Sequence, residues 1–343
     1  MTINQRKDGG ITVLELQGRL DSFSSHDTDR QVTKLIDDGV LKIVLDLSGL
    51  EYVSSAGLRV VLSAAKRIRQ AQGKMVLACP APQVKKVLDV AGFSTILPIF
   101  ATMDEAVKDC RIAAVAHTEH VKAANFKLTA AEEIYLLALD ESRGVVRTLP
   151  DFTLDYALAS ALLMELELFD RIDTDLTTLK VTSAVPTGEP LLDETLLELQ
   201  RKTDPQPTSF WLELLTARKG HIEGQVLAQL IRKGILKQEN RRILWVFETH
   251  RYPLMDDREV KEVRARLREL ILSDDIPDPR DVVLISLGKA CRLLDALFTQ
   301  EENERVRPRI SSLARLDLIG DELANSISEL ERKVAIASMP HSM

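Results

Sequence analysis

The rhythm of apolar residues changes near residue 112, and this change restricts the folds open to the chain more than any other feature. Before that point, strand-like runs alternate with helical spacing. Residues 10–18 alternate apolar and polar side chains, residues 41–47 form a nearly continuous apolar run, and helical spacing follows from about Ala56 to Gln70. Strands and helices that alternate in this way predict an α/β domain, with a mixed or parallel sheet and helices packed on it.

Beyond residue 127 the pattern is almost wholly helical. Thr129 and Glu132 have the T-x-x-E spacing of a capping box, and residues 156–172 are apolar around most of a helix, which is typical of a central, buried helix. Residues 234–254 are the exception, because they contain two β-prone runs joined by a polar turn. The second half is therefore predicted to be a mostly α-helical domain with a β-hairpin.

The segment between the halves, residues 111–127, is small, alanine-rich and without a firm apolar face, which favours a linker. We predict an N-terminal domain over residues 1–112, a linker over residues 113–125 and a helical domain over residues 126–343. Because the linker has no face that would dock the domains against each other, each domain is expected to fold independently.

Charge and composition exclude several classes of protein. The formal net charge is −7 and aromatic residues make up 4% of the chain, which argues against a nucleic-acid partner. Cys79, Cys110 and Cys291 lie far apart, without metal or redox spacing, so the expected location is a reducing cytoplasm. No apolar run approaches the roughly 20 residues that span a bilayer, so any membrane contact is expected to be peripheral, at the inner face of the membrane.

Catalytic motifs are absent from the sequence. It contains no nucleotide-binding, hydrolase or metalloprotease motif, and its six histidines lack neighbours at metal-ligand spacing. We therefore predict no catalytic residue, no cofactor and no metal site. Glu132, Glu133, Asp140 and Glu141 could be imagined as an acid–base cluster, but carboxylates in the first turn of a helix and near its exposed end predict dipole partners and solvated surface.

Three stretches of the first half carry a family resemblance: "GRLDS" (residues 18–22), "DLSGLEYVSSAGLRVVL" (residues 46–62) and "VLDVAGFSTILPIFATMDEAV" (residues 87–107). With these motifs the first half resembles the STAS family, the domain of bacterial anti-sigma factor antagonists. In that family an anti-sigma kinase phosphorylates the serine two residues before the glycine-leucine of the middle motif, which is Ser55 here. Ser54 stands where the family often has an aspartate.

Two interpretations of Ser55 follow. A serine at the start of a helix can simply cap it, which contributes around 1 kcal/mol. Alternatively Ser55 is a phosphoacceptor, because the free amides and dipole of a helix N-terminus accommodate the roughly −1.5 to −2 charges of a phosphoserine. That charge would break a complex whose surface receives a neutral hydroxyl. Ser54 is the weaker phosphoacceptor candidate and would serve as the cap.

The second half resembles the Golgi phosphoprotein 3 family. The resemblance rests on residues 128–144, 162–172, 186–196 and 230–236 and on a hairpin that ends in "YPL", in the family's order. It implies binding of a phosphoinositide such as phosphatidylinositol 4-phosphate at membranes, through a tryptophan and three arginines. The corresponding positions here are Pro150, Ala159, Gly220 and Glu223. The cations near enough in sequence to replace those arginines are Arg143, Arg147, Arg218, Lys219 and His221.

The hairpin suggests a further contact. Arg241 and Arg242 are expected at the start of its second strand, followed by five apolar residues. The residues predicted to contact lipid or membrane are Arg241, Arg242, Leu244, Trp245 and Phe247. Since this hairpin also mediates self-association in the family, the same apolar face is equally open to a second copy of the chain.

Together these features predict a non-catalytic regulatory protein. Its STAS domain would bind an anti-sigma factor or a similar serine kinase, with Ser55 as a phosphorylation switch, and its helical domain would bind an anionic lipid surface. The alternative is a scaffold or adaptor without a phosphorylation switch, in which the helical domain binds protein or self-associates.

Overall fold

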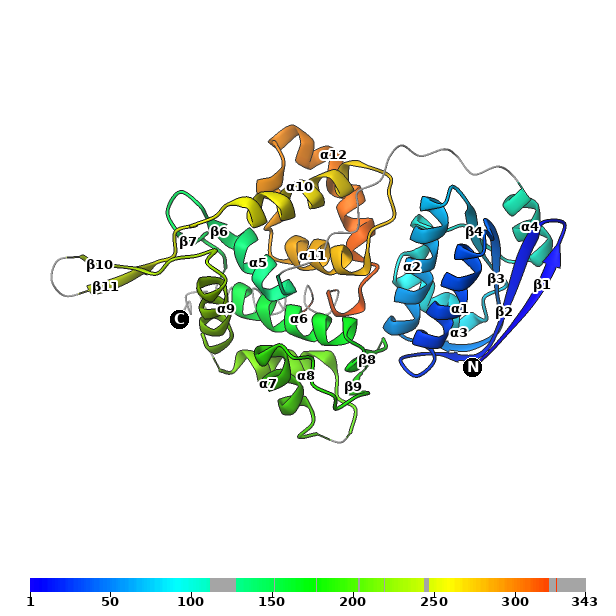
Figure 1. The fold of residues 1–343 in the computed structure, drawn as a ribbon, viewed down its shortest axis with the longest axis horizontal. Coiled ribbons are helices and arrows are strands. Elements are labelled where there is room, and N and C mark those ends of the chain that lie inside the picture. The colour runs from blue at the N-terminus through cyan, green and yellow to red at the C-terminus, as the bar shows by residue number, and fades with distance from the viewer. Residues whose placement is uncertain are drawn as a thin grey trace, which may run out of the picture.

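A computed structural model describes residues 1–111 and 128–320, apart from 151, 177, 203, 219 and 244–246, together with residue 325. For residues 240–243 and 247–250 it describes the backbone alone. The predicted linker, residues 113–125, lies outside the described residues, so its prediction stays a prediction. In Figure 1 the N-terminal sheet domain and the helical domain lie side by side.

The N-terminal domain contains a five-stranded mixed sheet in the order β1-β2-β3-β4-β5. The strands are β1 (Thr2–Asp8), β2 (Ile11–Leu20), β3 (Lys42–Val53), β4 (Lys74–Ala78) and β5 (Ile99–Phe100). The first pair is antiparallel and the remaining pairs are parallel. The predicted mixed sheet is therefore confirmed.

Helices cover both faces of this sheet. Along β3, Ile43 and Leu45 belong to one apolar core, and Val44 between them belongs to a second core on the other face. The first face carries α1 (Ser25–Asp37), α2 (Ser55–Gln70) and α3 (Pro82–Val90), and the second carries α4 (Met103–Arg111) (Figure 1). Burial on both faces explains the nearly continuous apolar run that the sequence shows at this strand.

The second domain is mostly helical, as predicted, and is built around α6 (Thr153–Leu168), whose sides are buried along most of its length. Around it lie α5 (Ala130–Ala138), α7 (Pro190–Leu199), α8 (Thr208–Thr216), α9 (His221–Arg232), α10 (Arg258–Leu272), α11 (Pro279–Ala290) and α12 (Gln300–Ala314). Two short strand pairs join them, β6 (Leu139–Asp140) with β7 (Val145–Val146) and β8 (Ile172–Thr174) with β9 (Leu179–Val181). Among the described residues, no helix is long and apolar enough to cross a membrane.

The predicted hairpin is confirmed, but the predicted position of its turn is wrong. It consists of β10 (Glu239–Ile243) and β11 (Phe247–Arg251), and it projects from the helical domain in Figure 1. Arg241 and Arg242 therefore lie in the first strand, which ends at Ile243, and not at the start of the second. The register explains the difference, because it sets Arg242 opposite Glu248, and opposite charges stabilise a cross-strand pair.

The capping box at the start of α5 is present, but Glu132 and Glu133, the two carboxylates in the first turn of this helix, are not on the surface. The Thr129 amide donates to Glu132 Oε2 over 2.7 Å, and Glu132 Oε2 also lies 2.7 Å from Lys233 Nζ. Glu133 is ion-paired with Arg266 at 2.9 Å and with Arg280 at 3.1 Å. Both glutamates are buried, so the prediction of solvated surface is wrong for them. Lys233, Arg266 and Arg280, from other parts of the helical domain, balance the charge of these buried carboxylates.

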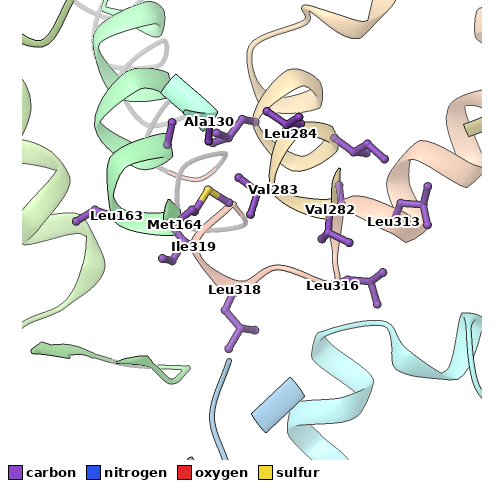
Figure 2. Packing of buried hydrophobic residues seen from close by; sticks show 14 of the residues in the cluster. Ala130, Leu163, Met164, Val282, Val283, Leu284, Leu313, Leu316, Leu318 and Ile319 are labelled. Carbon is purple, nitrogen blue, oxygen red and sulfur yellow. The ribbon is translucent and has the colours of Figure 1, made fainter. Parts of the chain in front are cut away.

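Contact between the two domains was not expected from the sequence. Leu58 and Leu62 of α2 share a small lined space with Met164 of α6 and Val282 of α11. Figure 2 shows Leu316 and Leu318 on the side of the helical core that faces the N-terminal domain. Apolar residues from both domains therefore belong to one contiguous core cluster.

Candidate functional site

The site is built on the first turn of α2, at the end of β3. Ser54 is the N-cap: its backbone is extended, its Oγ accepts from the Gly57 amide at 3.5 Å, and its own amide donates to Leu20 O at 3.0 Å. Ser55 is the first helical residue, and the capping bond is made by its neighbour. Of the two interpretations of this junction, capping belongs to Ser54, and the hydroxyl of Ser55 points to other partners.

Those partners belong to the helical domain. The Ser55 hydroxyl donates to Glu167 at the end of α6 and accepts from the Thr174 amide of β8 at 3.3 Å. Its oxygen also lies 3.5 Å from Asp173 Oδ1. Ser55 is only 5% exposed as a result. Ser55, the predicted phosphoacceptor, is therefore buried between the two domains.

Asp173, in the helical domain, accepts hydrogen bonds from backbone amides of the N-terminal domain at and beside the start of α2. Its Oδ1 accepts from the Ala56 amide at 3.4 Å and its Oδ2 accepts from the Ser22 amide at 3.2 Å. Free amides and the helix dipole make a helix N-terminus favourable for an anion. In this structure the anion at that position is a carboxylate of the same chain.

Arg59, one turn further along α2, balances the charge of Glu167. Its guanidinium lies 2.9 Å from the Glu167 carboxylate and donates to the Glu167 carbonyl oxygen at 2.6 Å. Burial raises the pKa of the Glu167 carboxyl, an effect that Arg59 and the Ser55 hydroxyl oppose and Asp173 reinforces. The buried polar cluster thus contains two carboxylates for one guanidinium.

Further polar contacts surround this cluster. The Tyr52 hydroxyl donates to Asp175 at 3.1 Å, and burial together with Asp175 raises the pKa of Tyr52. Lys66 pairs with Asp278, and Arg69 donates to the Asp274 carbonyl at 2.7 Å. Cations on α2 therefore face carboxylates and carbonyls of the helical domain.

Those cations proposed for a lipid headgroup that the structure describes already have partners within the domain. Arg143 lies 3.8 Å from Asp140, Arg147 donates to the Leu139 carbonyl at 3.4 Å, and Arg218 lies 2.8 Å from Glu194. His221 contacts the same glutamate, and Lys219 lies outside the described residues.

Pro150, Ala159, Gly220 and Glu223, the positions predicted to correspond to the family's headgroup residues, include no arginine. Ala159 is fully buried, and burial and Asp155 raise the pKa of Glu223. The described part of the chain contains no group of three or more histidine, cysteine or acidic side chains that could hold a metal ion.

The hairpin residues proposed for membrane contact are described in part. Arg241 and Arg242 lie in β10 and Phe247 in β11, each known by its backbone position. Leu244 and Trp245 lie outside the described residues. Their roles stay predictions.

Comparison with known proteins agrees with the two domains. Residues 2–106 match the model of the STAS domain and residues 130–330 match that of Golgi phosphoprotein 3 (GPP34). BtrV of Bordetella bronchiseptica, which is named as an anti-sigma factor antagonist, is 38% identical over 106 residues, or 31% of this chain and 91% of BtrV.

Two solved structures are similar to the same part of the chain. An anti-sigma factor antagonist from Thermotoga maritima is 25% identical and covers 32% of this chain and 95% of its own length, with a TM-score of 0.31. The phosphorylated form of the Bacillus cell fate determinant SpoIIAA is 22% identical and covers 32% of this chain and all 100% of its own, with a TM-score of 0.28.

The mixed sheet, the serine pair at the start of α2 and the 38% identity to BtrV define the N-terminal domain as a STAS domain of the anti-sigma factor antagonist class. The chain belongs to the Golgi phosphoprotein 3 (GPP34) family, whose model covers more than half of it, with this STAS domain at its N-terminus.

Proposed function

We propose that this is a non-catalytic regulatory protein whose STAS domain binds an anti-sigma factor or a similar serine kinase, with Ser55 as the phosphoacceptor. The observation that carries the proposal is that the two serines have different roles at the start of α2. Ser54 makes the capping bond of α2, so the Ser55 hydroxyl is not used in the cap, and it stands at the position where the family is phosphorylated. Phosphate there would face the helix N-terminus, which favours an anion.

Ser55→Ala is expected to abolish phosphorylation of the protein isolated from its native cell, as measured by phosphopeptide mass spectrometry. The matched control is Ser54→Ala, which should retain the phosphate and lose about 1 kcal/mol of stability with its cap. Phosphate that persists in Ser55→Ala and disappears in Ser54→Ala would contradict the assignment.

The alternative function is a scaffold or adaptor without a switch, in which the STAS domain serves assembly alone. The polar contacts between α2 and the helical domain favour the adaptor, because the unphosphorylated chain already makes them. A pull-down from the native cell with wild type and Ser55→Asp separates the two. A kinase of the anti-sigma type that is captured by wild type and lost by Ser55→Asp supports the switch, whereas identical partners support the adaptor.

For the helical domain we propose peripheral contact with an anionic membrane at the inner face, in the cytoplasm, through the hairpin. The described strands of the hairpin, β10 and β11, extend away from the helical body (Figure 1). Two arginines near an anionic leaflet contribute on the order of 1 kcal/mol each, and each inserted large apolar side chain roughly 1.5–3 kcal/mol. Because the headgroup positions of the family hold no arginine here, the proposed binding is salt-sensitive and shows little headgroup choice.

Trp245→Glu is expected to reduce co-sedimentation with vesicles of phosphatidylserine and phosphatidylcholine, while the mass in solution stays the same. Leu197→Glu is the control, because Leu197 is an apolar residue of α7 that is 63% exposed elsewhere on the domain. If the mass of Trp245→Glu instead falls towards that of a monomer, the hairpin serves self-association. If the protein unfolds, Trp245 is a core residue and the membrane proposal loses its support.

A further inference from the structure

The surface of the STAS domain around Ser55 already has a partner within the same chain. The buried cluster brings Ser55 against Glu167 and Asp173, and its rim adds contacts from Tyr52, Lys66 and Arg69. All of these bonds join the STAS domain to residues 167–278 of the helical domain. The contact therefore covers the residue on which the proposed switch depends.

Covering matters for phosphorylation because a kinase needs the hydroxyl free. Ser55 is 5% exposed, and its hydroxyl donates to Glu167 and accepts from the Thr174 amide. A kinase active site has to surround the acceptor serine and its neighbours, and here α6 and β8 occupy that space. A chain with its domains in contact is not a substrate.

Phosphate on Ser55 is in turn incompatible with the domain contact. Asp173 accepts from the Ala56 amide at the start of α2 and from the Ser22 amide beside it, where a phosphate on Ser55 would otherwise bind. Glu167 contacts the same hydroxyl, and Arg59 is the cation that balances it. Two further negative charges within hydrogen-bonding distance of two carboxylates repel strongly at the effective dielectric constant of such sites.

We infer that the GPP34-family domain is an intramolecular partner of the STAS domain, which shields Ser55 while the domains are in contact and is released when Ser55 carries a phosphate. The inference rests on the proposed role of Ser55 as phosphoacceptor. It adds that the acidic surface around Glu167 and Asp173 competes with the external kinase or anti-sigma partner for the same face of α2. Separation of the two domains and binding of the external partner to α2 therefore favour each other.

The first test needs no knowledge of the kinase. The full chain is made with phosphoserine incorporated at position 55, and amide hydrogen exchange is followed in peptides over residues 54–59 and 167–175. We expect exchange there to accelerate about tenfold or more, because like charges drive the domains apart. Phosphoserine at position 142 is the matched control, since Ser142 is exposed on the β6–β7 turn and does not contact the STAS domain. Unchanged exchange in the Ser55 form would overturn the inference.

The second test opens the contact without a phosphate. Lys66→Glu and Asp278→Lys each reverse one partner of an ion pair between the domains, and the double variant restores a pair of opposite charges. Each single variant is expected to speed exchange at residues 54–59 several-fold, and the double variant to slow it again. Lys108→Glu is the control, because Lys108 lies on α4, on the far face of the sheet. Single variants that exchange like wild type would overturn the inference.

The same variants separate this inference from the proposed function. In the native cell, Lys66→Glu should carry more phosphate on Ser55 than wild type does, because the open chain is the substrate. Equal phosphorylation of both proteins would overturn the shielding role. If neither protein carries phosphate on Ser55 but hydrogen exchange changes as predicted above, the proposal that Ser55 is a phosphoacceptor is wrong. The contact between the domains would then be an assembly interface.

Discussion

Gly57→Ala should destabilise the STAS domain by about 3 kcal/mol and disorganise the start of α2. A Cβ at this position would lie 2.4 Å from the Leu20 carbonyl oxygen and 2.9 Å from Val53 Cγ2. The oxygen belongs to β2 and already accepts from the Ser54 amide, so neither it nor the helix can move aside. Overpacking of this kind costs typically 1–3 kcal/mol, and a rigid backbone atom sets the cost at the upper end.

The control for this substitution is expected to change the stability in the opposite direction. Gly224 lies in α9 with open space where a Cβ would stand, so Gly224→Ala should stabilise the helical domain by about 0.5–1 kcal/mol. Calorimetry gives the change in stability and hydrogen exchange assigns it to one domain. If Gly57→Ala were neutral, the close approach of α2 to β2 would be wrong, and with it the position of Ser55.

This close approach gives physical meaning to the family motifs. "GRLDS" supplies the Leu20 carbonyl, and "SSAGL" supplies the Ser54 amide and the glycine that fits against it. Sequence alone predicted the STAS fold and the position of Ser55 because these motifs are local and each occupies the end of a strand or the start of a helix. The structure adds that the two motifs touch.

The residues that cover Ser55 could not be predicted in the same way. Glu167 and Asp173 lie 112 and 118 residues away in sequence, and their role depends on how two domains dock. The sequence does contain one indication of such a contact. Glu167 belongs to a helix that the sequence predicts to be buried, and a buried carboxylate requires a partner. The pattern showed the need for a partner but could not identify it as Ser55 or Arg59.

The hairpin illustrates a different limit. The β-prone residues predict that it exists, but they also predict a turn among the polar residues, because polar residues usually form turns. Cross-strand pairing decided otherwise, since Glu239 faces Arg251 and Arg242 faces Glu248. Register is a property of two strands together, and the composition of either one does not determine it.

Arg266→Ala should destabilise the helical domain by about 3–5 kcal/mol, because it breaks buried ion pairs between residues far apart in the sequence. Arg266 is 8% exposed, and its guanidinium lies 2.9 Å from both Glu133 of α5 and Asp281 of α11. Alanine removes the cation and leaves these two carboxylates inside the domain. Burial already raises the pKa of Asp281 with the arginine present, so its carboxylate is the costlier of the two to leave without it.

Arg258→Ala tests whether this loss comes from burial or from α10 itself. Arg258 lies at the start of the same helix, but it is exposed and pairs with Asp256 across two residues. Its removal should change the stability little, because exposed ion pairs contribute little. Calorimetry of the two variants, with hydrogen exchange in α5 and α11, measures the difference. Similar losses in both variants would mean that α10 depends on arginine for helix formation. A loss confined to Arg266→Ala would show that Glu133, which the sequence pattern predicts to lie on the surface, is held inside the domain by a cation 133 residues further along the chain.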